Sequence, residues 1–147
     1  MKTLKQLTKD FDYVNSEITE ENFPLVKRDH KGYKLFHLNQ NISSKDAIKE
    51  MRKEGYEPAS LLELLEWTEW NGTDVVVALG SVAEVGGGRH VSCLDEDGSG
   101  RRLSLGWFDR DWFGRCRFLG VRLSSETGHL DTLPDTLTIN GVMYKRQ

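Results

Sequence analysis

A continuous apolar run, Val75 to Leu79, constrains the fold of this chain more than any other feature. The run has the length of a strand and follows the turn signal Asn71-Gly72. A strand that lacks polar alternation has to be covered on both of its faces. We therefore expect a sheet with this strand at its centre and a further layer on each side.

Short segments after Gly86 add strands to this sheet. Three of them, His90 to Leu94, Arg102 to Trp107 and Arg117 to Arg122, contain alternating residues and are separated by Gly- and Asp-rich turns. An earlier alternating run, Tyr33 to Leu38, is expected to form the first strand of the chain. These segments predict an antiparallel or mixed sheet.

Two helices are expected between the first strand and the apolar run. Ser43 can cap a helix that ends at Gly55, and Ser60 with Glu63 forms the S-x-x-E pattern that opens another. Outside this central part we expect a short N-terminal helix and a C-terminal hairpin. The helix would carry Leu4, Leu7, Phe11 and Val14, and the hairpin would span Thr136 to Tyr144 around Asn140-Gly141.

The chain has 147 residues, which suits one domain. We predict a single α+β domain with an N-terminal extension at 1–31, a candidate binding segment at 86–122 and the hairpin region at 123–147. A net charge of -3 argues against a general binder of nucleic acid or anionic membranes. No run is long enough to span a membrane, and no signal-peptide pattern opens the sequence. We expect a cytoplasmic protein unless another route carries it out of the cell.

The binding segment has an unusual composition. Lys and Asn are absent from Gly72 to Ile139, although both are frequent before it. Adenine-directed mutagenesis of former Asn codons would leave such a mixture, and between Gly86 and Arg117 only Glu96, Trp107 and Trp112 cannot arise in that way. A sheet-rich half that uses few Lys and Asn would give the same bias, because both are depleted in strands.

Three motifs in this order resemble a known family. They are GYEPA at 55–59, VVALGS at 76–81 and RFLGVR at 117–122, within a region from Tyr33 to Arg122. The chain resembles the C-type-lectin-fold variable proteins of diversity-generating retroelements. The last motif is similar to the terminal core strand of that fold and of the related formylglycine-generating enzymes.

The resemblance implies a C-type-lectin-like fold and a hypervariable protein that recognises a target, rather than an enzyme. An alternative is a lectin-fold interaction module that is not diversified. A small enzyme related to the formylglycine-generating enzymes is a further alternative, but the chain does not place the catalytic cysteines that they need. We expect no cofactor.

Alternation predicts where the ligand would bind. Leu103, Leu105 and Trp107 should face the core, whereas Arg102, Ser104 and Gly106 should face solvent. We expect the displayed residues to form one solvent-facing surface for a protein or peptide ligand, with no specific nucleic acid. The expected site residues are His90, Ser92, Arg102, Ser104, Gly106, Asp109, Arg110, Asp111, Phe113, Arg115 and Cys116. Phe118 is assigned to the core, and Trp112 is left open between core and surface.

Other chemical patterns in the segment are incomplete. Asp95 to Gly100 begins like a calcium loop of the EF-hand type, but Gly106 stands where the bidentate Glu is required. Cys93, Cys116 and the histidines have no standard zinc spacing, so no metal site is expected. Whether the two cysteines are free or bridged stays open.

Overall fold

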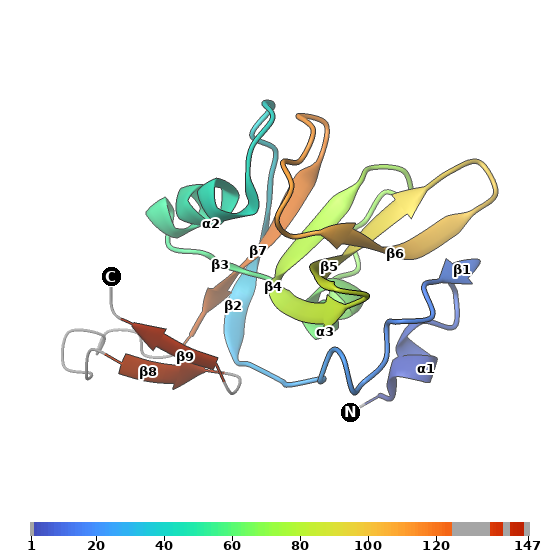
Figure 1. Ribbon diagram of the computed structural model, residues 1–147, viewed down its shortest axis with the longest axis horizontal. Helices are drawn as coiled ribbons and strands as arrows, with labels where there is room; N and C mark the ends of the chain where they lie inside the picture. Colours follow the sequence, from blue (N-terminus) through green and yellow to red (C-terminus); the bar gives the residue numbers. More distant parts are fainter. Residues whose placement is uncertain (1, 125–135, 140–141, 146–147) are drawn as a thin grey trace.

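The computed structural model describes residues 2–124, 136–139 and 142–145, and within them the protein is α+β with a seven-stranded mixed sheet (Figure 1). The helices are α1 (Leu4–Leu7), α2 (Ser44–Lys53) and α3 (Leu61–Glu66). The strands of the large sheet are β1 (Tyr13–Val14), β2 (His30–Phe36), β3 (Glu57–Pro58), β4 (Val76–Val85), β5 (Gly88–Glu96), β6 (Arg101–Trp107) and β7 (Arg117–Leu123). A second sheet pairs β8 (Thr136–Ile139) with β9 (Val142–Lys145).

The apolar run lies at the centre of the large sheet, as predicted. The strand order is β1-β6-β5-β4-β7-β2, with β3 also paired to β7. Strand β4 runs antiparallel to β5 and parallel to β7, which makes the sheet mixed. Val76, Val77, Ala78 and Leu79 are all buried because both faces of this strand are covered.

Each face of the sheet has its own apolar cluster. Leu61 and Leu64 of α3 belong to the same cluster as Val76 and Ala78, and we call this side the α3 face. Met51 of α2 belongs with Val77 and Leu79 to the other cluster, on what we call the α2 face. Alternation along β4 puts these two sets on opposite sides, and Figure 1 shows α2 and α3 at separate places along the sheet.

Both central helices begin at the predicted caps. The Ser43 hydroxyl accepts from the Asp46 backbone N–H, and the Ser60 hydroxyl accepts from the Glu63 backbone N–H. The Glu63 side chain accepts in return from the Ser60 N–H, which completes a capping box. Helix α2 ends at Lys53, and the chain changes direction at Gly55. The φ of Gly55 is 85°, which suits a residue without a side chain.

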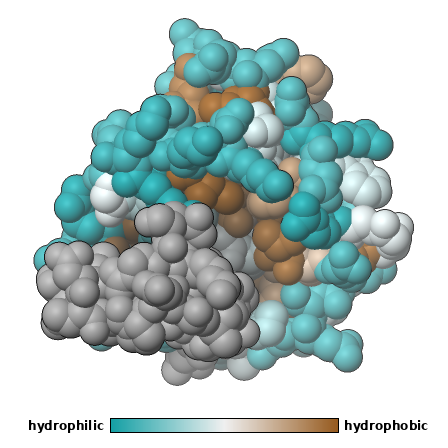
Figure 2. Space-filling view, turned by 60° about the vertical axis from the view of Figure 1, so that its left-hand side comes forward, coloured by the Kyte–Doolittle hydropathy of each residue, from teal (hydrophilic) through white to brown (hydrophobic). Residues whose placement is uncertain are grey.

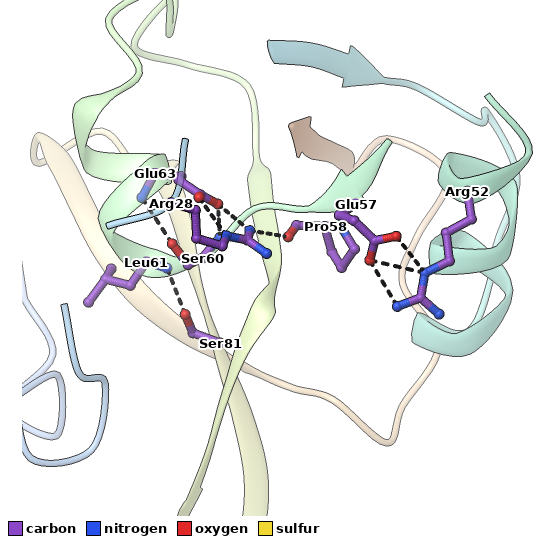
Figure 3. A network of polar contacts seen from close by, with 8 residues as sticks. All are labelled: Arg28, Arg52, Glu57, Pro58, Ser60, Leu61, Glu63 and Ser81. Atoms are coloured by element: carbon purple, nitrogen blue, oxygen red, sulfur yellow. Dashed lines mark hydrogen bonds and ion pairs between the residues drawn. The ribbon is translucent and has the colours of Figure 1, made fainter. Parts of the chain in front are cut away.

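A buried ion pair ties the segment before β2 to α3 (Figure 3). Arg28 donates through Nε and Nη2 to the two carboxylate oxygens of Glu63, at 2.8 and 2.5 Å, and through Nη2 to the Pro58 carbonyl at 3.2 Å. The side chain of Glu63 is only 2% exposed. Beside it, the Leu61 N–H donates to Ser81 Oγ of β4 at 2.8 Å.

The two ends of the chain differ in detail from the predicted elements. The N-terminal helix ends at Leu7, and Val14 lies in β1 beside β6. Its neighbours Asp12 and Asn15 donate their backbone N–H groups to carbonyls of β6, so these groups cannot make helical hydrogen bonds. The first long strand begins at His30 and ends at Phe36, before the predicted end at Leu38.

The predicted C-terminal hairpin is confirmed as the antiparallel pair of β8 and β9. Its predicted turn, Asn140-Gly141, lies outside the described residues, as does most of the region before β8.

Candidate functional site

The register between β5 and β6 overturns the prediction that the site residues of both strands share one face. Ser92 lies opposite Leu105, and Cys93 lies opposite Ser104. His90 and Ser92 therefore face the same side as the core residue Leu103, on the α3 face. The predicted display residues of β6 point to the α2 face instead. A shift of one residue in the pairing of two strands exchanges the faces that match.

Several predicted solvent-facing residues are also buried. Ser92, Ser104 and Cys116 belong to the buried class, and Ser92 is 0% exposed. Strand β5 is an interior strand between β4 and β6, so neighbouring strands flank Ser92 on both sides. Its side chain is also covered on its own face of the sheet. Trp107 was expected in the core but is 40% exposed, where it packs on His90 with ring centroids 4.2 Å apart.

The loop from Phe108 to Cys116 matches the prediction better. Its charged side chains and Phe113 are exposed, and Phe113 reaches 61%. These exposed residues are Asp109, Arg110, Asp111, Phe113 and Arg115. The loop therefore presents a mixture of charged and aromatic side chains to solvent.

Trp112 holds the middle of this loop in place. Its backbone exchanges two hydrogen bonds with Ile42, at 2.7 and 3.1 Å. Its indole Nε1 donates to Ser44 Oγ at 2.9 Å, and that hydroxyl donates to the Phe108 carbonyl at 2.7 Å. The ring packs edge-on against Phe118 of β7. The half-buried Trp112 is therefore an anchor of the loop.

A second attachment follows at Gly114. Its N–H donates to Asn41 Oδ1 at 3.0 Å, and its carbonyl lies 3.1 Å from His37 Nε2. A Cβ at this position would lie 3.1 Å from the backbone nitrogen of Gln40, so the close approach favours glycine. The backbone of the loop is thus fixed from the segment 37–44 while its long side chains stay exposed.

A groove of about 620 Å³ lies beside the loop. It is bordered by the turn before β4, the hairpin between β5 and β6, and the loop itself. Its lining residues are Thr73, Asp74, Val75, Cys93, Asp95, Glu96, Asp97, Leu105, Gly106, Trp107, Arg110, Asp111, Trp112, Phe113, Arg115, Cys116 and Arg117. The parallel pairing of β4 with β7 brings the starts of these strands together, which places the turn before β4 at the groove.

Part of the groove's lining is apolar. The Trp112 ring lies over Gly106, where a Cβ would come within 2.5 Å of it. Cys93 and Cys116 are free, buried thiols. Burial raises the pKa of Cys93 to about 12 and raises the pKa of Cys116. Both thiols are therefore neutral near pH 7, and neither has the lowered pKa of a nucleophilic cysteine.

Most carboxylates of the groove already have cationic partners. Arg102 donates to Asp95 at 2.8 Å and to Asp97 at 2.9 Å, and Arg117 pairs with Asp74 at 3.4 Å. Hydrogen bonds from Ser99 are the main cause of the lowered pKa of Asp97. Within the described part of the chain, no group of three or more His, Cys, Asp or Glu residues could hold a metal ion.

Two arginines of the loop lie over aromatic rings and have no ion pair with a described carboxylate. Arg110 lies 4.9 Å from the Trp107 ring centroid, and Arg115 lies 5.3 Å from that of Phe113. Asp109 is different, because its carboxylate pairs with Arg89 outside the groove, and this hydrogen bond lowers the pKa of Asp109.

The groove brings together part of the predicted site. Gly106, Arg110, Asp111, Phe113, Arg115 and Cys116 line it. His90, Ser92, Arg102, Ser104 and Asp109 do not. Sequence reasoning missed Cys93 and Asp74 as lining residues and left Trp112 undecided. The sequence does contain one indication that Trp112 is an anchor. A large aromatic ring among polar loop residues is expected to pack against another part of the protein.

Exposed apolar residues elsewhere are scattered. On the face drawn in Figure 2, hydrophilic residues cover most of the described surface and hydrophobic ones appear between them in small patches. Among the described residues the large exposed hydrophobic side chains are Tyr13, Val26, Val82, Trp107 and Phe113. Only Trp107 and Phe113 of these line the groove.

Comparison with protein-family models, with curated proteins and with solved structures finds no match for the chain. No helix in the described part of the chain is long and apolar enough to cross a membrane.

Proposed function

We propose that this protein is a target-recognition domain whose binding surface is the groove together with the loop Phe108–Cys116. One observation carries the proposal: the loop has a backbone fixed by Trp112 and Gly114 and side chains that are exposed. Rigid aromatic residues beside adaptable polar groups are typical of protein recognition surfaces. The ligand class that suits this mixture of charges is a protein or peptide.

We further propose a C-type-lectin-like fold. The motif at 117–122 lies in β7, a strand paired on one side with β2 and on the other with β3 and β4. This position inside the sheet, with partners on both sides, agrees with the terminal core strand that the resemblance implies. The capped helices α2 and α3 also agree with the two helices that it implies.

We also propose that a retroelement diversifies the segment. Trp112 cannot arise from an Asn codon by adenine-directed mutagenesis, and it is also the anchor of the loop. Phe113 and Arg115 can arise in that way, and both are exposed. Diversification that spares the anchor and changes its exposed neighbours would alter recognition while keeping the loop in place.

An ordinary interaction module would use the same groove, so the genome has to separate the two. We expect a near copy of the coding sequence for 86–122 close to the gene, beside a reverse-transcriptase gene. The two copies should differ almost only where the second copy has adenine. A locus without either feature would reject diversification and leave the ordinary interaction module.

The enzyme alternative receives less support from the site. A nucleophilic cysteine needs a lowered pKa, whereas the pKa values of Cys93 and Cys116 are raised.

A further inference from the structure

Arg110 and Arg115 give the groove a specific chemical preference. Each guanidinium stacks on an exposed ring, at 4.9 Å from Trp107 and 5.3 Å from Phe113. A cation–π contact of this kind holds a guanidinium over a ring without using all of its N–H groups, so some remain available for a planar anion. Both side chains therefore have a preferred orientation before any ligand binds.

These two charges are not neutralised locally. Within the part of the chain that the structure describes, neither Arg110 nor Arg115 has a carboxylate partner, whereas Asp74, Asp95 and Asp97 are paired with other arginines. Glu96 and Asp111 also line the groove without a cationic partner among the described residues, but neither is held against a ring. Arg110 and Arg115 are therefore the groove cations that no described carboxylate neutralises, since Arg117 pairs with Asp74.

The apolar lining next to these arginines suits a side chain of the ligand. Trp112 and the neutral thiols of Cys93 and Cys116 line the same groove. The groove volume of about 620 Å³ lies within the range of about 300 to 1,000 Å³ found for ligand pockets, so the groove can take one or a few side chains of a ligand.

We infer that the groove binds an acidic peptide segment, with an apolar or aromatic side chain against Trp112 and Asp or Glu carboxylates on Arg110 and Arg115. This inference rests on the proposed function and narrows it to one ligand class. The carboxylates accept charge-assisted, bidentate hydrogen bonds from the guanidinium edges. A peptide can place single carboxylates on Arg110 and Arg115, whereas a continuous phosphate backbone would bring further charges against the carboxylates of Glu96 and Asp111 at the same groove.

A selection from a random peptide display library on the full chain tests the inference. We expect the selected peptides to be enriched in Asp or Glu next to an apolar or aromatic residue. A synthetic peptide of the selected sequence should lose about tenfold in affinity for each of Arg110→Gln and Arg115→Gln, since hydrogen bonds to charged groups are among the stronger ones. Replacing its carboxylates by amides should cause a similar loss.

Arg122→Gln is the matched control. Arg122 is also exposed and also stacked on a ring, 4.7 Å from the centroid of Tyr56, but it does not line the groove. Its replacement should leave peptide affinity unchanged. A general effect of positive charge would instead weaken binding in all three variants and would overturn the inference.

The remaining outcomes separate the inference from the function on which it rests. Selected peptides without acidic residues whose binding is lost in Phe113→Ala would reject the acidic ligand and keep the recognition groove. If no peptide is selected, or if selected peptides ignore every substitution in the loop, both are rejected. A single-stranded oligonucleotide that binds through Arg110 and Arg115 while acidic peptides do not would also overturn the inference.

Discussion

The N-terminus of α3 and the loop Phe108–Cys116 use polar residues in opposite ways. At α3 the charged groups point inward, and Glu63 accepts from both Arg28 and the cap residue Ser60. In the loop the charged side chains are exposed to solvent. Its backbone is fixed by hydrogen bonds to the segment 37–44. Trp112 and Gly114 provide that attachment.

This difference separates folding from recognition. A buried charge that loses its partner leaves a desolvated group behind, so the α3 cluster cannot change without a loss of stability. An exposed side chain on a fixed backbone contributes little to stability and can be exchanged. The predictions below test this separation, from the largest expected change in stability to the smallest.

Glu63→Ala should cause the largest loss of stability. It removes the buried carboxylate that pairs with Arg28 and half of the capping box, so we expect about 3 to 5 kcal/mol of destabilisation. Glu66→Ala is the control, because Glu66 pairs with the largely exposed Lys27 and its pair is worth about 0 to 1 kcal/mol. Urea unfolding measures both. Equal losses would show that the buried pair has no special role.

Gly106→Ala should destabilise by about 1 to 3 kcal/mol, the usual effect of overpacking. The added methyl group meets the Trp112 ring at 2.5 Å, so the ring has to move. A second substitution, Trp112→Phe, removes part of that ring and should recover some stability in the double variant. If Gly106→Ala is as stable as the wild type in chemical denaturation, the ring does not lie over this glycine.

Ser44→Ala should cost about 2 kcal/mol, since two hydrogen bonds are lost at roughly 1 kcal/mol each. The indole of Trp112 and the carbonyl of Phe108 lose their partner, so tryptophan fluorescence should change as well. Ser43→Ala, which removes a helix cap, should cost about 1 kcal/mol without that spectral change. The same fluorescence change in both variants would count against a specific anchor.

Arg110→Gln, Phe113→Ala and Arg115→Gln should each change stability by no more than about 0.5 kcal/mol, because their side chains are exposed. Thermal unfolding checks this. A clear loss in any of them would mean that the loop side chains support the fold.

Local signals in the sequence predicted much of the fold. The apolar run predicted β4, and the capping residues Ser43 and Ser60 predicted where α2 and α3 begin. Each of these signals depends on residues close together in the chain, so no distant contact was needed to interpret them.

The relation between segments could not be predicted in the same way. The register of β5 against β6 depends on how the turn after Glu96 folds, and it puts Ser92 and Ser104 on opposite faces instead of the expected shared face. The parallel pairing of β4 with β7 joins distant parts of the chain and brings Asp74 to the groove. Periodicity divides the residues of one strand between two faces. It does not say which of these sets lies on the same side of the sheet as a given set of the neighbouring strand.

The most direct test of the separation compares two protein libraries for resistance to a protease. One library randomises the exposed positions of the loop, Asp109, Arg110, Asp111, Phe113 and Arg115. The other randomises the anchors, Ile42, Ser44, Trp112 and Gly114. We expect most members of the first library to resist the protease like the wild type and most members of the second to be cleaved. Similar survival in both libraries would contradict the account, because the loop would then have no distinct anchors and no freely variable surface.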